Sequence, residues 1–556
     1  MKHLDRRSFL VLASGVAASC ATGGGSGLHR GTRCNLLLQG GTVVDGSGAP
    51  GFVADVAVRG DRIVGIGSLD ARDADLVLDV RGLHVCPGFV DIHTHSDSSI
   101  FRWPGAESRV RQGVTTEVTG NCGGSAAPRP VAAPAEETDA SEPVARQRWS
   151  DVRSYGEAWQ QADPAVNHAM LVGHGTLRRA VMGDVDRRAT AAELASMTTL
   201  LEQALDQGAI GLSTGLEYVP GMFAPPEEVQ HLCRSVAARG GLYASHMRSE
   251  EDQLLQAVDE ALAVGRVTGV RVQVSHLKAC GRANWPLLEE AIRRIEAARA
   301  AGVDVMADAY PYTAYSTTLT ILLEPWARDG GSAEVVKRLR DPVLRERMRN
   351  ELPGHVARDP GGFELVVISS VDAKEHENCI GRNLVEVGAA WKCDPAEAVL
   401  RLLEASECGV SFIGHGIASE GVERVLAHPL VMVGSDGRTM APTGRIVDRP
   451  HPRSYGTFPR VLGRYTREHQ LFDLPTAVRK MTALPAQRAG LTGRGLVALD
   501  HFADLVVFDA ANVRDEATWA EPQRYPTGIV HVAVNGELVV RDGKGTTARP
   551  GRWLPA

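Results

Sequence analysis

The order of apolar and polar residues divides the chain into three regions. Residues 34–85 alternate short β-branched runs with turn residues, and the same pattern returns towards the other end of the chain, within residues 485–556. In each region a two-residue turn, Gly60-Asp61 or Asn535-Gly536, separates two apolar runs, which is typical of a β-hairpin. We therefore expect a small β-sandwich that combines residues 34–85 with residues 485–556.

The middle region, residues 86–484, alternates buried-type strands with amphipathic helices. Thr190 and Glu193 have the spacing of a capping box, and apolar residues then recur on one face as far as Gly208, a typical helix stop. This α/β repeat predicts a (β/α)₈ TIM barrel with its active site at the carboxyl ends of the strands. Nine segments read as barrel strands, one too many, which leaves the seventh strand open: 88–93, 115–120, 168–173, 209–213, 241–245, 271–275, 304–308, 411–414 and 430–435.

A different pattern interrupts the middle region at about residues 318–405. The strand–helix rhythm is lost there, and residues 338–349 form a strongly charged stretch. We expect an inserted helical subdomain, or lid, in this part of the barrel.

The first 33 residues have the pattern of an export signal followed by a tether. Arg6-Arg7 precede an apolar run, Phe9–Ala18, that is too short to span a bilayer and is typical of a twin-arginine signal. Cys20 follows small residues, as at a lipoprotein cleavage site, and residues 23–27 are rich in Gly and Ser. We expect an exported bacterial protein, either periplasmic or anchored to the membrane by a lipid on Cys20; ordinary cleavage with an incidental Cys20 is the alternative.

Composition narrows the functional classes further. The net charge is −7 and the sequence contains no long basic run, which argues against nucleic acid as a partner. Nine cysteines in 556 residues are odd in number and sparse, so a disulfide framework is not expected. Individual cysteines therefore need individual explanations.

Metal-ligand residue types recur where the predicted strands end. Each has an ordinary alternative, such as a solvated histidine pair, a buried apolar cysteine or a turn aspartate. Glycines on both sides of Cys122, however, allow a close backbone approach that core packing does not require. Five strand ends with such residues together predict a metal site at the top of the barrel, with these candidates: His93, His95, Cys122, His246, His276 and Asp436.

Several motifs resemble one known family over residues 34–545. GFVDIHTHSD, GNCGG, ASHMRSE, SHLKACG, DAYPYTAYST and HPRSYGTFPRVLGRY are similar to those of the D-aminoacylases, N-acyl-D-amino-acid deacylases of the amidohydrolase superfamily. Residues 211–218, at the end of the fourth predicted strand, contain no Lys, unlike the hydantoinases and dihydroorotases, which have a bridging carboxylated Lys.

The resemblance implies zinc-dependent hydrolysis of the amide bond of N-acyl-D-amino acids. Cys122, His246 and His276 would hold one Zn²⁺ tightly, whereas His93, His95 and Asp436 would form a second, weaker site. Asp436 would take a proton from the attacking water and pass it to the leaving amine. The residues expected around the substrate are Tyr218, Lys278, Tyr310, Ser316 and Arg453.

Departures from the family pattern leave the shape of the pocket open. Tyr315 stands where the family commonly has Gly, and the segment before the HPR motif carries Arg438, Arg445 and Arg449. These arginines could favour an acidic D-residue or simply line a solvated loop. A periplasmic dipeptidase, a cyclic-amide hydrolase and a non-catalytic binding lipoprotein are the remaining alternatives, and the oligomeric state is open.

Overall fold

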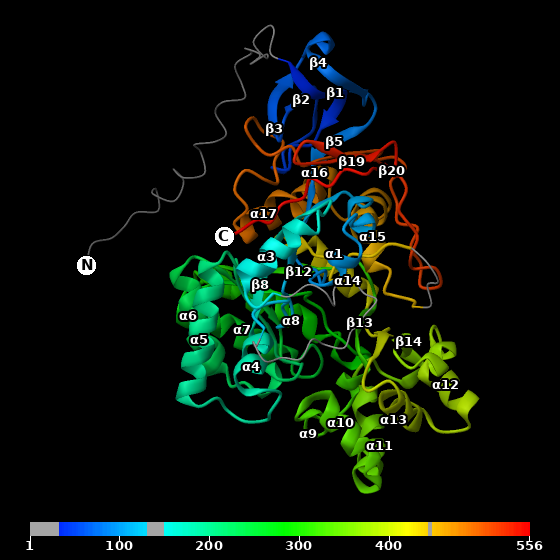
Figure 1. The fold of residues 1–556 in the computed structure, drawn as a ribbon. Coiled ribbons are helices and arrows are strands. Elements are labelled where there is room, and N and C mark those ends of the chain that lie inside the picture. The colour runs from blue at the N-terminus through cyan, green and yellow to red at the C-terminus, as the bar shows by residue number, and fades with distance from the viewer. Residues whose placement is uncertain (1–32, 130–148, 443–447) are drawn as a thin grey trace.

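The computed structural model describes residues 33–129, 149–442 and 448–556. The predicted export signal with Arg6-Arg7, the candidate lipid anchor Cys20, and Arg445 lie outside these residues. Within them, no helix has both the length and the apolar character needed to cross a bilayer. Figure 1 shows a terminal β region at the top, a central barrel, and a mostly helical unit at the lower right.

The middle of the chain forms the predicted barrel of eight parallel strands. Each strand pairs with the next along the chain, and the strands are almost entirely buried. A parallel bridge between Thr94 and Gly437 links the first strand to the last. The strands are β6 (Phe89–Asp91), β7 (Val114–Thr119), β8 (Asn167–Gly173), β9 (Gly211–Gly215), β10 (Leu242–His246), β11 (Arg271–Val274), β12 (Val305–Ala309) and β16 (Val431–Val433).

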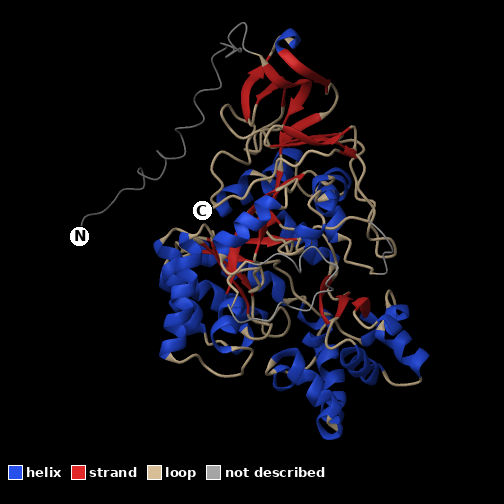
Figure 2. Ribbon diagram, viewed as in Figure 1, coloured by secondary structure: helices blue, strands red, loops and turns tan. Residues whose placement is uncertain are grey.

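Helices surround this barrel and follow the predicted sequence signals. The capping box of Thr190 and Glu193 is present, and the helix that it begins buries Met197, Leu201 and Leu205. The helices around the barrel, shown in blue in Figure 2, are α1 (Ser99–Arg102), α2 (Glu107–Val110), α3 (Val152–Gln161), α4 (His174–Met182), α5 (Ala191–Asp206), α6 (Pro226–Ala238), α7 (Leu254–Thr268), α8 (Leu287–Ala300), α14 (Ser419–Ala427), α15 (Arg453–Arg460), α16 (Leu474–Met481) and α17 (Ala483–Ala489).

One barrel-strand prediction was wrong, and the insertion is larger than predicted. Residues 411–414 belong to β15 (Val410–Gly414), which pairs antiparallel with β13 (Tyr315–Thr318) and β14 (Val366–Val371) outside the barrel. A short apolar run fits a strand in either sheet, so periodicity could not assign it. The seventh strand is therefore β12, and the inserted unit contains a three-stranded sheet besides α9 (Pro325–Arg328), α10 (Gly331–Arg340), α11 (Pro342–Arg358), α12 (Leu384–Trp391) and α13 (Pro395–Ala405).

The two ends of the chain meet in one continuous nine-stranded sheet, rather than in two separately hydrogen-bonded sheets of a sandwich. Antiparallel pairing of Val85 with Val507 joins them, and side chains from both ends share an apolar core. Tight turns at Gly60-Asp61 and Asn535-Gly536 form the two predicted hairpins. The strands are β1 (Cys34–Val43), β2 (Phe52–Arg59), β3 (Arg62–Gly67), β4 (Ala74–Asp79), β5 (His84–Pro87), β17 (Leu505–Phe508), β18 (Ile529–Val534), β19 (Glu537–Arg541) and β20 (Lys544–Gly545).

A buried cation ties the first two barrel strands to the last. The fully buried Arg109 donates from Nη2 to Asp91 Oδ2 at 2.8 Å and to Ser435 Oγ at 2.7 Å. Its Nε donates to Glu117 Oε1 at 2.7 Å. Burial raises the pKa of Asp91 to about 6, although Arg109 and Ser435 oppose that shift. The positive charge of Arg109 therefore offsets the charge of the carboxylates of Asp91 and Glu117 beneath the carboxyl ends of the strands.

Replacing this cation by a neutral side chain of similar length tests the closure of the barrel. We expect Arg109→Met to destabilise the protein by about 3–5 kcal/mol, because two buried carboxylates lose their partner. Circular dichroism during heating should show a clearly lower unfolding midpoint. Arg153→Met, at an exposed position on α3, should leave the midpoint unchanged. Equal midpoints for both variants would contradict the role given to Arg109.

Candidate metal centre

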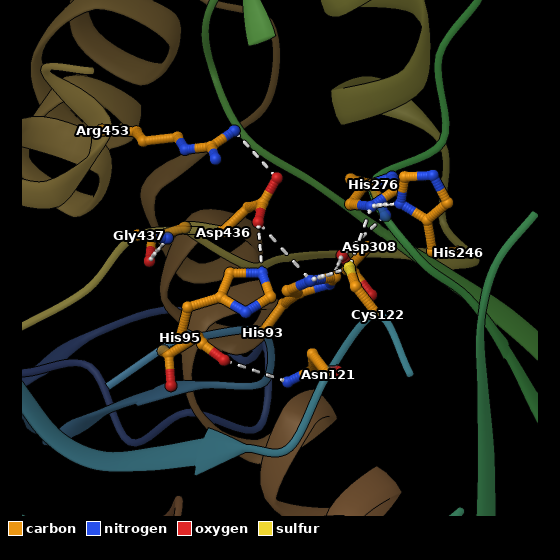
Figure 3. Close-up of polar contacts among 12 residues, drawn as sticks. His93, His95, Asn121, Cys122, His246, His276, Asp308, Asp436, Gly437 and Arg453 are labelled. Carbon is orange, nitrogen blue, oxygen red and sulfur yellow. Dashed lines mark hydrogen bonds and ion pairs between the residues drawn. The ribbon is translucent and has the colours of Figure 1, made fainter. Parts of the chain in front are cut away.

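The carboxyl ends of five barrel strands bring all six predicted ligands together (Figure 3). They form two groups in which the donor atoms lie within 4.8 Å of one another. The first group contains His93, His95, Cys122 and Asp436, and the second contains Cys122, His246 and His276. Cys122 belongs to both, so the two sites suggested by the resemblance would share its sulfur. The metal-binding roles themselves stay predictions.

Short distances between donor atoms show that the side chains face a common centre. Cys122 Sγ lies 3.3 Å from His93 Nε2 and 3.5 Å from His276 Nε2. His246 Nδ1 lies 2.9 Å from His276 Nε2, and His95 Nε2 lies 2.9 Å from Asp436 Oδ1. A thiolate and imidazoles in this arrangement are the donors that Zn²⁺ prefers.

Unusual backbone conformations position three of the six side chains. Cys122, His276 and Asp436 have φ angles of 51°, 33° and 52°, in the left-handed region. This conformation costs a non-glycine residue about 1–2 kcal/mol, so the surrounding structure has to hold it in place. Before Cys122, a Cβ on Gly120 would lie 1.9 Å from the carbonyl oxygen of Leu171, so only glycine fits there. The expected close backbone approach is therefore present.

Three carboxylates that the sequence analysis did not single out lie beside the imidazole rings. Asp308 Oδ1 lies 3.2 Å from His93 Nδ1. Glu217 Oε2 lies 2.8 Å from His246 Nε2, and Glu250 Oε1 lies 2.8 Å from His276 Nδ1. Asp308 and Glu217 hydrogen-bond the ring nitrogens that point away from the centre, an arrangement typical of metal-binding histidines. Glu250 Oε1 makes no hydrogen bond, and Lys278 Nζ lies 2.9 Å from His276 Nδ1. In the sequence, each of the three is an acidic residue close to the end of a predicted strand, and this position was the only signal that pointed to it.

The electrostatics of the cluster favour a charged sulfur. Burial opposes ionisation of Cys122, but His93 and His276 lower its pKa well below the ordinary value. Burial also opposes protonation of the imidazoles, yet contacts with Asp436 and Cys122 raise the pKa of His95 to about 9. Contacts with Cys122 and Glu217 raise the pKa of His246 to about 10. The protons on these rings balance negative charge that a bound cation would otherwise balance.

Asp436 is held as a carboxylate by its surroundings. Burial acts against the charge, but Arg453, His95 and His93 keep the pKa of Asp436 well below its ordinary value. Its Oδ2 lies 2.8 Å from Arg453 Nη1, on the side away from His95 (Figure 3). The carboxylate therefore lies between the histidines and Arg453.

A cavity of about 230 Å³ opens onto this centre and contains every predicted substrate residue. Its volume suits a small molecule rather than a polymer. Besides five of the six candidate ligands, its lining includes the predicted Tyr218, Lys278, Tyr310, Ser316 and Arg453. His93 lies behind this lining and is fully buried.

The five predicted substrate residues differ in how their polar groups are engaged. Tyr310 Oη is buried without a hydrogen bond, and Arg453 Nη1 has only its ion pair with Asp436. Lys278, in contrast, pairs with Glu250 Oε2 at 2.5 Å, and the Tyr218 hydroxyl lies 3.1 Å from Thr317 Oγ1. Ser316 accepts a hydrogen bond from Arg453 through its carbonyl oxygen. Tyr310 and Arg453 therefore have donors available for a ligand.

Arg453 and Tyr315 both lie in the cavity wall. Arg453 is only 6% exposed, so it is not a charge on a surface loop. Tyr315 lines the cavity as expected, and its hydroxyl donates to Asp359, whose pKa burial raises to about 7. The bulky ring is thus anchored to the inserted unit.

Comparisons with known proteins agree with this geometry. The amidohydrolase family model matches residues 76–264 and 404–540. N-acyl-D-glutamate deacylase of Alcaligenes xylosoxydans xylosoxydans is 40% identical over 525 residues, covering 94% of this chain and 96% of that protein. D-aminoacylase of the same organism is 41% identical over 520 residues, with coverage of 94% and 97%. The chain belongs to the D-aminoacylase family of amidohydrolases.

A solved structure also supports membership of the D-aminoacylase family, because it resembles the fold over nearly the whole chain. N-acyl-D-glutamate deacylase from Bordetella bronchiseptica, complexed with zinc and a phosphonate mimic of the tetrahedral intermediate, has a TM-score of 0.80 at 37% identity. The match covers 94% of this chain and all of that one. As a D-aminoacylase family member the chain is an enzyme of the hydrolase class. Residues 265–403, which the family model leaves unmatched, contain His276 and most of the inserted unit.

The lowered pKa of Cys122 predicts that iodoacetamide alkylates this thiol selectively when the enzyme is free of metal. Between about pH 6 and pH 8 its iodoacetamide reaction should be fast and nearly independent of pH, because the thiolate is already formed. Cys393, which is also partly exposed, has a raised pKa, so its slower reaction should accelerate as the pH rises. Peptide mass spectrometry would follow both sites, and equal rates at about pH 6 would disprove the assigned thiolate.

Proposed function

We propose that this enzyme uses zinc to hydrolyse the amide bond of N-acyl-D-amino acids, releasing a carboxylate and a D-amino acid. The observation that carries the proposal is Cys122, a thiol of lowered pKa shared by two ligand groups at the base of a small cavity. The N-acyl-D-glutamate deacylase and D-aminoacylase relatives supply the reaction class, and the zinc in the Bordetella bronchiseptica enzyme supports the metal.

The donor set of this chain fits zinc. Cys122, His246 and His276 would hold one ion tightly, and a carboxylate oxygen lies 2.8 Å from the outer nitrogen of each imidazole ring. His93, His95 and Asp436 would contribute to a second, weaker site. Bound zinc polarises a carbonyl group and lowers the pKa of water towards about 7.

The remaining steps belong to residues of the chain. Asp436 would accept a proton from the attacking water and then deliver it to the leaving amine nitrogen, acting as base and acid in turn. The α-carboxylate of the substrate would replace Asp436 as the partner of Arg453, because a guanidinium binds a carboxylate through two parallel hydrogen bonds. Tyr310 Oη, which lacks a hydrogen bond in the described structure, would donate to the same carboxylate.

A substrate panel tests this function. Zinc-loaded enzyme should release free amino acid from N-acetyl-D-amino acids, and turn over the L-enantiomers, simple dipeptides and hydantoin far more slowly. The readout is kcat/KM from a chromatographic assay of the released amine. Turnover of only L-substrates, dipeptides or hydantoin would reject the proposal.

Two variants control for catalysis by a contaminant. Asp436→Asn keeps the size of the side chain but cannot carry the proton, so kcat should fall by about 100-fold or more. Arg449→Gln, at an exposed position on the same segment, should retain the wild-type kcat. Full activity of Asp436→Asn would show that Asp436 is not the base and acid of the reaction.

We also propose that the protein is exported and anchored through Cys20. The support is the twin-arginine pattern and the small residues before this cysteine.

A further inference from the structure

A second cavity, of about 250 Å³, borders the cavity of the candidate metal centre. Tyr218, Thr318 and Ile321 line both cavities. The remaining walls of the second cavity come mostly from α4, the segment after β9, and α9 and α10 of the inserted unit (Figure 1). Its described lining contains none of the six candidate ligands. The second cavity is therefore a separate space at the junction of the barrel and the inserted unit.

Arg328, the last residue of α9, is a buried cation in the wall of the second cavity. The residue is only 8% exposed. Its Nη1 donates to the carbonyl oxygen of Glu217 at 3.0 Å, but its Nε is buried without a hydrogen-bond acceptor. The carboxylate of Glu217 is engaged elsewhere, 2.8 Å from His246 Nε2. Within the described ranges the guanidinium thus has a backbone partner but no ion pair, and a buried charge without one is costly.

The other acidic residues around the second cavity do not supply the missing negative charge. Asp184 is the one acidic residue of the described lining, and it pairs with Arg179 at 2.9 Å. Glu324, directly before α9, pairs with Arg358 at 3.3 Å. The described lining therefore carries one positive charge, that of Arg328, that is not balanced within the cavity.

The amino end of α10 adds hydrogen-bond donors to the same cavity. Gly331 and Ser332 begin this helix of 10 residues, and both line the cavity. The first N–H groups of a helix have no acceptor within the helix, and the preceding Gly330 offers no side-chain cap. Such a helix end favours anions through its free N–H groups and its dipole. A buried cation and an uncapped helix end therefore line one small cavity.

We propose that the second cavity binds a small carboxylate, held by Arg328 and the amino end of α10. A guanidinium binds a carboxylate through two parallel hydrogen bonds, and the unsatisfied Nε of Arg328 is one donor of such a pair. The proposed deacylation releases a carboxylate from the acyl group, and the shared wall with Tyr218 places this cavity next to the point of release. The inference rests on the proposed function and adds a product site to it.

The test blocks the metal centre first and then titrates the second cavity. Zinc-loaded enzyme is saturated with a phosphonate analogue of an N-acetyl-D-amino acid, which occupies the cavity of the metal centre. Acetate is then added, with sodium chloride at equal ionic strength as the reference, and the midpoint of thermal unfolding is measured. A ligand that binds only the folded state raises this midpoint as its concentration rises. We expect acetate to raise it further than chloride does.

Variants of one side chain show where acetate binds. Arg328→Gln should raise the apparent dissociation constant of acetate by roughly 10- to 100-fold, because the charge-assisted hydrogen bonds are lost. Arg328→Lys keeps the buried charge, which guards against a mere loss of folding, and should bind acetate more weakly than the wild type because a bidentate pair cannot form. Arg340→Gln, at an exposed position on α10 outside the cavity, should keep the wild-type response.

The outcomes separate the product site from the proposed reaction. A midpoint of the wild-type enzyme that acetate raises no further than chloride, or an equal acetate response in Arg328→Gln, would overturn the product site alone. A response to inorganic phosphate without one to acetate would overturn the assignment to a carboxylate. Failure both to bind the phosphonate and to hydrolyse any N-acyl-D-amino acid would overturn the deacylase function, and the product site with it.

Discussion

The contact between one sulfur and several imidazole rings is the constraint on which the rest of this structure depends. Cys122 lies against His93 and His276, and the unfavourable burial of its charge is offset by those rings. Such a cluster is stable only where charges of both signs compensate each other, either through protons on the rings or through a bound cation. The barrel provides this compensation because parallel strands deliver side chains to one end.

The hydrogen bonds that close the barrel also position residues of the candidate site. Asp436 N donates to the carbonyl oxygen of His93 at 2.8 Å, and His95 N donates to that of Gly437 at 2.8 Å. These two hydrogen bonds join the first strand to the last and also fix the candidate ligands His93 and His95 relative to Asp436. Arg109 supports the same junction from below. The left-handed backbone of Asp436 is therefore held by a hydrogen bond that also closes the barrel.

Much of the centre could be predicted because barrel strands place their carboxyl ends together, so strand-end residues of the right type converge. That rule was enough to predict that the six candidate ligands, from His93 to Asp436, lie close together. It could not find Asp308, Glu217 and Glu250, since an acidic residue near a strand end is equally common in loops. The partner of Lys278 was equally hidden, because its side chain pairs with Glu250 across the segments that follow β10 and β11. The assignment of residues 411–414 failed because a short apolar strand has the same pattern in any sheet.

The most direct test of the account is X-ray absorption at the zinc edge of the zinc-loaded enzyme. A site built on Cys122 predicts one sulfur scatterer at about 2.3 Å together with nitrogen at about 2.0–2.1 Å. The sulfur contribution should disappear in Cys122→Ser. A wild-type spectrum with nitrogen and oxygen neighbours only would contradict the central role of this thiolate.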